Sequence, residues 1–156
     1  MNVIDSDDQS PRFIHDLYTS KVRIFILVSS NIGNIALHIY FWIFQIVSGI
    51  NSGALEVSPE KIHAEDQDTL RSTIKYELIS GSPPDFANFF QINFQNGVVT
   101  QIAPVSRTSA KEYNIIVRAT EMPNVGKFAE TNLVIKIKAE DLNPPVLSAS
   151  DTIGKK

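Results

Sequence analysis

The residues of this chain that are best suited to chemistry are acids, and they gather in two short clusters. The clusters contain Asp5, Asp7 and Asp8, and then Glu65, Asp66 and Asp68. Neither cluster is interrupted by a lysine or an arginine. Close carboxylates repel one another unless they stay hydrated or share a cation, and a hard cation with oxygen ligands such as calcium is a common solution. Each cluster is therefore either part of a calcium site or a solvated acidic loop.

Other kinds of site are excluded by the composition. The 156 residues contain no cysteine, which removes thiol catalysis, cysteine-ligated zinc and disulfide bonds. A net charge of −3 argues against a broad basic surface for nucleic acid. No Gly-rich phosphate loop or nucleophile elbow is present, so we expect no enzyme activity. Asp5, Asp7 and Asp16 are spaced as in an EF-hand loop, but Ser10 replaces the turn glycine and no helices flank it.

Alternating apolar and polar residues predict the strands that must position these acids. The predicted strands are 62–64, 74–78, 90–94, 98–102, 113–119 and 133–139. Asn96-Gly97 predicts a hairpin turn between two of them, and Phe89, Phe90 and Phe94 are expected in the core. Short strands separated by frequent turn residues predict an all-β fold, an antiparallel β-sandwich.

The acids and strands follow one another in an order that resembles a cadherin repeat. Residues 3–13 are similar to the linker between repeats, in which Asp-x-Asn-Asp-Asn precedes x-Pro-x-Phe. Residues 62–68 are similar to the Ala-x-Asp-x-Asp signature that follows the second strand. The later motifs Tyr76–Gly81, Phe90–Ile92, Gly97–Val99 and Tyr113–Glu121 extend the resemblance over residues 3–147. It implies a seven-stranded antiparallel Greek-key β-sandwich, interrupted here by an apolar insert.

In this family calcium lies between successive repeats, and the resemblance implies which residues would bind it. The implied ligands are Asp5, Asp7, Asp8, Gln9, Asp66, Asp68 and Glu121, with Gln9 contributing its backbone oxygen. All of them belong to the junction with a preceding repeat. Calcium there would neutralise the repulsion between carboxylates and stiffen the junction.

The positions implied for the next junction lack most of these acids. Residues 105–108, Val-Ser-Arg-Thr, stand where the family has Leu-Asp-Arg-Glu. Ala139 and Leu142 replace two aspartates of the second linker. Because calcium needs several charged oxygens to offset its dehydration, we expect the C-terminal junction to be poor in calcium and more flexible.

An apolar block interrupts the predicted repeat. Residues 24–55 contain no charged side chain if His38 is neutral. This uncharged segment is long enough for a membrane span. Arg23, Tyr40 and Trp42 would serve as interfacial anchors. An unusual buried hairpin is the other structural explanation.

A second hypothesis treats the same block as a retained intron or a gene-model error. Val22-Arg23 and Phe44-Gln45 can be encoded by codons that resemble a splice donor and a splice acceptor. Removing residues 22–45 would delete 24 residues in frame. The deletion would restore the family's spacing and put Ser48 in the place of the first-strand glutamate.

The resemblance therefore predicts three segments and one function. Residues 1–11 are a linker from a preceding repeat, 12–145 a cadherin-like repeat with the apolar insert at 22–50, and 146–156 the start of a next repeat or a tail. The implied function is calcium-dependent cell–cell adhesion or recognition at the extracellular side of the plasma membrane. The implied partners are neighbouring repeats and other cadherins in cis or trans. The alternative is a β-sandwich binding domain, tethered to a membrane by residues 24–50, in which the acids are only solvated.

Overall fold

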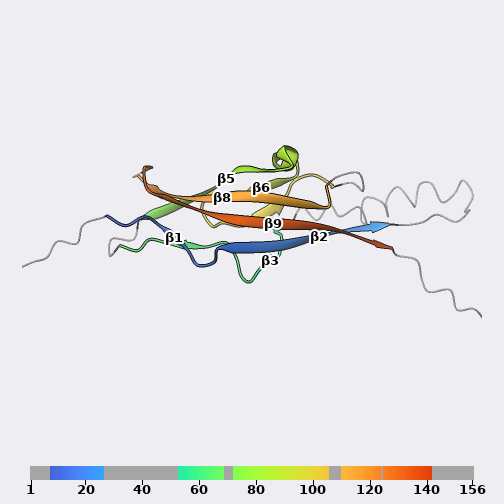
Figure 1. Ribbon diagram of the computed structural model, residues 1–156, viewed down its shortest axis with the longest axis horizontal. Coiled ribbons are helices and arrows are strands. Elements are labelled where there is room, and N and C mark those ends of the chain that lie inside the picture. The colour runs from blue at the N-terminus through green and yellow to red at the C-terminus, as the bar shows by residue number, and fades with distance from the viewer. Residues whose placement is uncertain (1–7, 27–52, 69–71, 106–109, 124, 142–156) are drawn as a thin grey trace, which may run out of the picture.

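The computed structural model describes residues 8–26, 53–68, 72–105, 110–123 and 125–141, and its architecture is all-β (Figure 1). The strands are β1 (Arg12–Phe13), β2 (Leu17–Ile26), β3 (Val57–Ser58), β4 (Ala64–Glu65), β5 (Thr73–Ser82), β6 (Phe90–Ile92), β7 (Val99–Gln101), β8 (Glu112–Met122) and β9 (Phe128–Asp141). A 3-10 helix, η1 (Pro84–Asn88), connects β5 to β6.

Most of the hydrogen bonding belongs to one five-stranded sheet with the strand order β3-β2-β9-β8-β5. Strands β8 and β9 form an antiparallel ribbon that runs the length of the sheet, and β5 pairs antiparallel with the other edge of β8. Strand β2 pairs parallel with β9, from Leu17 opposite Asn132 to Ile26 opposite Asp141. The chain therefore enters the large sheet near one end and leaves β9 near the other (Figure 1).

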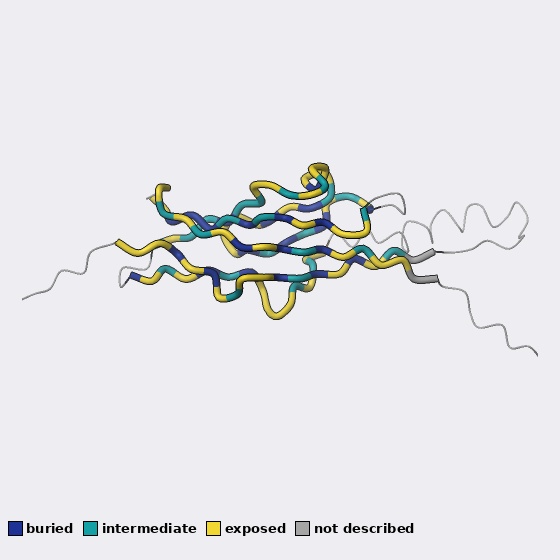
Figure 2. The backbone as a smooth tube through the Cα atoms, in the orientation of Figure 1, coloured by how far each residue is buried: buried dark blue, intermediate teal, exposed yellow. Residues whose placement is uncertain are grey.

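Two small sheets, β1-β4 and β6-β7, complete the sandwich, and one hydrophobic core includes residues from all three sheets. Figure 2 shows the alternation of buried and exposed residues along the strands. In β8 the buried apolar side chains are Tyr113, Ile115, Val117 and Ala119, two residues apart, because successive side chains of a strand point to opposite faces. The same core-facing series continues to Glu121, a carboxylate at an apolar position.

The all-β sandwich predicted from the sequence is confirmed, with two differences in detail. The described residues form nine strands because β1, β3 and β4 are separate two-residue pieces. The first and last long strands, β2 and β9, lie side by side and run in the same direction, so this pair is parallel. Such a pair has no hairpin whose turn residues could reveal it in the sequence.

The hairpin predicted at Asn96-Gly97 is present between β6 and β7. Gly97 has φ = 72°, and a Cβ there would lie 2.5 Å from the backbone oxygen of Ile62, so glycine fits both the turn and the close approach. Phe90 is buried and Phe89 packs against the core, as expected. The expectation for Phe94 is wrong: β6 ends at Ile92, and Phe94 is 55% exposed in the turn that follows.

The first residues of the predicted insert belong to the sheet. Residues 22–26 continue β2 against β9, and the Val22 side chain is buried. The remaining insert residues, 27–50, lie outside the described residues, so the span, hairpin and intron hypotheses stay predictions. Among the residues described, no helix has the length and apolar character needed to cross a membrane.

Candidate metal site

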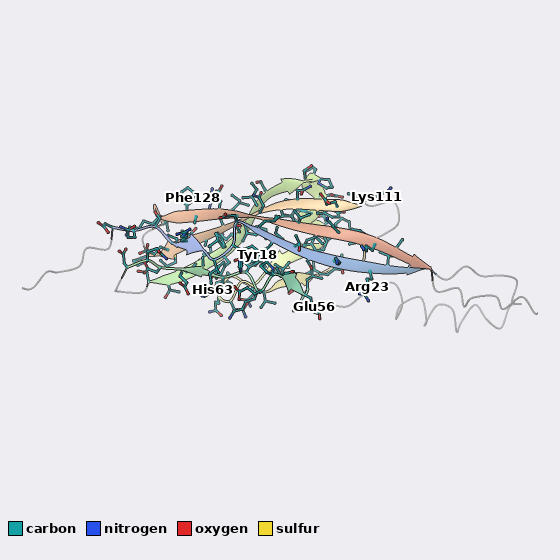
Figure 3. All side chains as sticks on the ribbon, turned by 60° about the horizontal axis from the view of Figure 1, so that its bottom comes forward. Tyr18, Arg23, Glu56, His63, Lys111 and Phe128 are labelled. Atoms are coloured by element: carbon teal, nitrogen blue, oxygen red, sulfur yellow. The ribbon has the colours of Figure 1, made fainter. Side chains whose placement is uncertain are left out.

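Two of the predicted metal ligands meet at the end of the molecule where the described chain begins. Figure 3 shows Phe128, at the start of β9, toward this end, and Arg23 and Lys111 toward the opposite end. Asp68 follows β4, and Glu121 lies near the end of β8. The Asp68 side chain is 4% exposed and that of Glu121 is 0% exposed, so both carboxylates are withdrawn from water.

A lysine lies against both of these carboxylates. Lys127 Nζ is 3.7 Å from Asp68 Oδ2 and 3.8 Å from Glu121 Oε2, and the lysine side chain is 15% exposed. Among the described residues, neither carboxylate oxygen of Glu121 has a hydrogen-bond partner. Isolated buried carboxylates are costly, so the ammonium group compensates part of the negative charge of the two acids.

The turn between β8 and β9 brings the lysine to the acids. The backbone N–H of Glu121 donates to the carbonyl oxygen of Lys127 at 3.0 Å, which continues the ladder by one step beyond Thr120 and Phe128. Val125 N–H donates to the Pro123 carbonyl within the turn. Because Glu121 continues the core-facing series of β8, its side chain points inward, where Asp68 also lies.

The loop after β4 is shaped by Asp66, which bonds to the backbone around it. Its Oδ1 accepts from Asp68 N–H at 2.9 Å, and its Oδ2 accepts from the N–H of Ser72. The incoming chain is joined to the same loop, because Gln9 N–H donates to Asp68 Oδ2 at 2.9 Å. The Asp68 carboxylate thus connects the N-terminal segment, the β4 loop and the β8–β9 turn.

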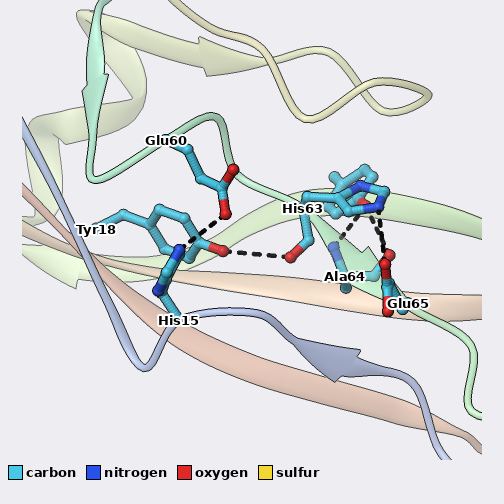
Figure 4. A network of polar contacts seen from close by, with 7 residues as sticks. His15, Tyr18, Glu60, His63, Ala64 and Glu65 are labelled. Carbon is cyan, nitrogen blue, oxygen red and sulfur yellow. Dashed lines mark hydrogen bonds and ion pairs between the residues drawn. The ribbon is translucent and has the colours of Figure 1, made fainter.

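A second polar network fixes the segment before β4 (Figure 4). The Tyr18 hydroxyl donates to the His63 carbonyl at 3.2 Å, and His15 Nε2 lies 2.9 Å from Glu60 Oε1. The Tyr76 hydroxyl accepts from Ala64 N–H at 3.0 Å. Burial raises the pKa of Tyr18 and of Tyr76, although the backbone hydrogen bonds to His63 and Ala64 partly oppose the shift. Both phenols therefore stay neutral hydrogen-bonding groups at neutral pH.

The structure brings together only part of the predicted ligand set. Asp68 and Glu121 share one cation, and Asp66 and Gln9 are attached to Asp68 through backbone hydrogen bonds. Asp8 is exposed, and its Oδ1 accepts from the Gln9 side chain at 3.4 Å. Asp5 and Asp7 lie outside the described residues. Within the ranges that the structure describes, no three His, Cys, Asp or Glu side chains are arranged to hold a metal ion.

The chemistry of these donors nevertheless fits a calcium ion. Buried carboxylate oxygens without hydrogen bonds, as in Glu121, are acceptors of the kind that calcium binds. Asp68 offers a second carboxylate beside the first. The site lies at the start of the described chain, so Asp5, Asp7 and Asp8 precede it closely in sequence.

Sequence reasoning missed Lys127. Neither acidic cluster contains a basic residue, but in three dimensions a lysine from a distant turn lies against Asp68. The local signal for this contact is that Lys127 follows Glu121 by six residues. The pairing of β8 with β9 as a hairpin then brings Lys127 back beside Glu121.

A separate cavity of about 1060 Å³ lies beside β2 and β3. Its lining combines the basic residues Lys21, Arg23 and Lys61 with Glu56, together with apolar and backbone groups. Of the described residues that line it, Glu56 alone is acidic. The buried carboxylates at the N-terminal end therefore remain the better candidate for binding chemistry.

Comparison with known proteins agrees with the resemblance in the motifs. The family model described as Cadherin domain matches residues 50–138. Cadherin-99C of Drosophila melanogaster is 36% identical over 155 residues, which is 99% of this chain and 8% of that protein. Human Cadherin-2 is 25% identical over 160 residues, which is 99% of this chain and 15% of that protein. The chain therefore spans a small part of these relatives.

Solved structures with low sequence identity share the fold. A protocadherin gammaB7 EC3-6 cis-dimer structure superposes with a TM-score of 0.61 at 15% identity, over 88% of this chain and 28% of that one. A mouse Cadherin-23 EC22-24 structure gives 0.57 at 18% identity, over 86% of this chain and 34% of that one. These likenesses concern the arrangement of the strands.

Proposed function

Because the chain belongs to the cadherin family, we propose that it is one repeat of a cadherin ectodomain and serves as a cell–cell adhesion or recognition module. Its place in this proposal is the extracellular side of the plasma membrane. Its partners are the neighbouring repeats of its own protein and other cadherins in cis or trans. The match to a cadherin domain over residues 50–138 supports the module, and the small share of each relative that the chain covers supports a repeat within a longer protein.

One observation supports the proposal that this function depends on calcium. Asp68 and Glu121 are buried carboxylates at the end of the domain where the linker enters, and both lie within 4 Å of the Lys127 ammonium group. Calcium bound there would supply a divalent charge that several carboxylates share. The protein ligands would be Asp5, Asp7, Asp8, Gln9, Asp66, Asp68 and Glu121.

The residues of the chain perform the mechanical part of this function. Gln9 N–H donates to Asp68, so the linker is attached to the same carboxylate that would bind calcium. Asp66 keeps the loop closed by accepting two backbone N–H groups. Neutralising the carboxylates removes the repulsion that would bend the linker, and a linker that does not bend holds successive repeats in one orientation.

The direct test is limited proteolysis with trypsin at Arg12, in EGTA and in about 1 mM free calcium, a concentration at which extracellular calcium modules bind. We expect calcium to slow cleavage at Arg12 in the natural chain. Asp68→Asn should remove that protection. Asp85→Asn, which changes an exposed aspartate of η1, is the matched control and should keep it.

Equal cleavage with and without calcium would contradict the calcium-dependent function. That result would favour the alternative of a β-sandwich binding domain whose acids are only solvated. Protection that survives Asp68→Asn would place calcium at other residues and would also contradict the proposal.

A further inference from the structure

The lysine between the two buried carboxylates is the feature of this end that a calcium site alone does not explain. Lys127 Nζ lies at nearly equal distances from Asp68 and Glu121, 3.7 and 3.8 Å. Calcium bound by the same two acids would take up the negative charge that the ammonium now compensates. Two cations at one pair of carboxylates repel each other, and the repulsion is strong where water is excluded.

We propose that Lys127 is a built-in counter-cation that competes with calcium for Asp68 and Glu121 and thereby sets the calcium concentration at which this junction responds. The inference rests on the proposed function, because it concerns the same two carboxylates. It adds a residue that the motifs do not identify and a mechanism by which this chain's own sequence tunes the site.

The position of Lys127 allows its head group to leave without unfolding the domain. Its carbonyl oxygen is held by Glu121 N–H, so the backbone stays in the β8–β9 ladder. Its side chain is 15% exposed, which gives the long flexible stem a path to water. The exchange of one cation for the other therefore needs a rearrangement of one side chain.

The surrounding loop is held by hydrogen bonds that do not depend on the lysine. Asp66 is bonded to the backbone of Asp68 and Ser72, and these bonds do not involve the lysine. When calcium is absent, the ammonium group is the positive charge beside the two carboxylates. The free energy of calcium binding is therefore the difference between the interaction of calcium with the acids and the interaction of the ammonium group with them. This competition lowers the apparent affinity for calcium.

The test replaces the lysine by an apolar residue of similar length, Lys127→Met, in the 156-residue chain. Calcium chloride alone is the titrant, and the amide NMR signals of Gln9 and Ser72 report binding because these groups donate to Asp68 and Asp66. We expect the calcium dissociation constant to fall about tenfold relative to the natural chain, a difference of about 1.4 kcal/mol. Lys75→Met is the matched control, since Lys75 pairs with Glu77 at 2.9 Å on the surface, and it should leave the constant unchanged.

A second measurement covers the case in which Lys127→Met is poorly folded without calcium. The rise in the thermal midpoint on adding saturating calcium should be larger for Lys127→Met than for the natural chain, because calcium then replaces a missing charge. A variant that stays unfolded at saturating calcium would overturn the inference, since calcium would have failed to take the place of the ammonium.

The outcomes separate the inference from the function on which it rests. If the natural chain binds calcium and Lys127→Met binds it with the same or lower affinity, the competition is overturned and the calcium site stands. If the natural chain shows no binding but Lys127→Met does, the lysine blocks the site, and the proposed calcium-dependent function fails for this chain. If neither binds calcium, both proposals are wrong.

Discussion

The two ends of the large sheet differ in where their charged side chains lie: they are buried at one end and exposed at the other. At the N-terminal end, two carboxylates and one ammonium group are enclosed together, and Lys127 Nζ lies 3.7 Å from Asp68 Oδ2 and 3.8 Å from Glu121 Oε2. Toward the other end, four cationic side chains, Lys21, Arg23, Lys136 and Lys138, are exposed on the neighbouring strands β2 and β9. The parallel register puts Lys21 opposite Lys136 and Arg23 opposite Lys138. Water and salt screen exposed like charges, whereas buried charges must be matched one by one.

This difference supports the proposal that the two junctions differ in calcium binding. The N-terminal end offers buried acids whose charge must be compensated by a cation. The described residues near the C-terminal end of β9 offer exposed cations, one exposed acid, Glu112, in register with Lys136, and an exposed alanine, Ala139, where the family has an aspartate. Cations near a junction repel calcium, so we propose a calcium-poor and more flexible C-terminal junction.

The largest expected effect is at the enclosed end. Lys127→Ala would remove the ammonium group that lies beside Asp68 and Glu121, and breaking a buried ion pair in this way costs about 3–5 kcal/mol. Urea unfolding in EGTA measures the loss in the free energy of unfolding. Lys136→Ala, the control at the other end, should change that free energy by less than about 0.5 kcal/mol. Equal losses for the two variants would remove the contrast between the ends.

The next effect concerns the support of the acidic loop. Tyr76→Phe removes the hydroxyl that accepts from the buried Ala64 N–H, and a buried donor left unsatisfied costs about 1–3 kcal/mol. Tyr18→Phe should cost less, because the His63 carbonyl that it leaves still accepts from Ile14 N–H at 3.2 Å. Thermal unfolding of the two variants tests the order. A larger loss for Tyr18→Phe would show that the network does not support the loop as described.

A smaller effect of opposite sign is expected at the basic end. Lys138→Glu converts the like-charged pair with Arg23 into an opposite-charged pair, and exposed ion pairs contribute about 0.2–1 kcal/mol. The variant should therefore be slightly more stable than the natural chain. The gain should shrink at high salt, because exposed charges are screened. A gain that is independent of salt would mean that charge is not its cause.

The smallest effect is a dependence on alkaline pH. Burial raises the pKa of Tyr18 and Tyr76 above the ordinary value near 10 in the folded state. The stability that these groups contribute is therefore fully present below the unfolded pKa and is lost as the pH rises through the folded values. Absorbance titration should show tyrosines ionising above pH 10, and Tyr76→Phe should remove one of them. Normal titration of both phenols would contradict their burial.

Strands β5, β8 and β9 could be predicted from the sequence because they alternate over many residues, whereas β2, which is as long as β5, was not among the predicted strands. Strands β5, β8 and β9 fall where the apolar positions recur at every second residue, and the β6–β7 hairpin falls at Asn96-Gly97. Two-residue strands such as β1 carry too few residues to show a period. Phe94 was placed in the core by continuing the alternation of β6 beyond Ile92, where the chain has already turned away.

Of the candidate site, only the acidic residues could be predicted from the sequence. The motifs identified Asp66, Asp68 and Glu121 by resemblance, and the structure brings Asp68 and Glu121 against one cation. Lys127 could not be predicted, because its contact with Asp68 depends on the packing of the β8–β9 turn against the loop after β4. The parallel pairing of β2 with β9 is also a tertiary contact between the two ends of the sequence, and no local pattern encodes it.

The measurement that tests the central claim most directly is a calcium titration of the chain followed by amide NMR at both ends. The account predicts saturable shifts at Gln9, Asp68 and Glu121, and no shift at Lys111 or Ile137, whose backbones are bonded to each other at the opposite end. Shifts at Lys111 and Ile137 without shifts at the N-terminal end, or no saturable shift anywhere, would contradict it.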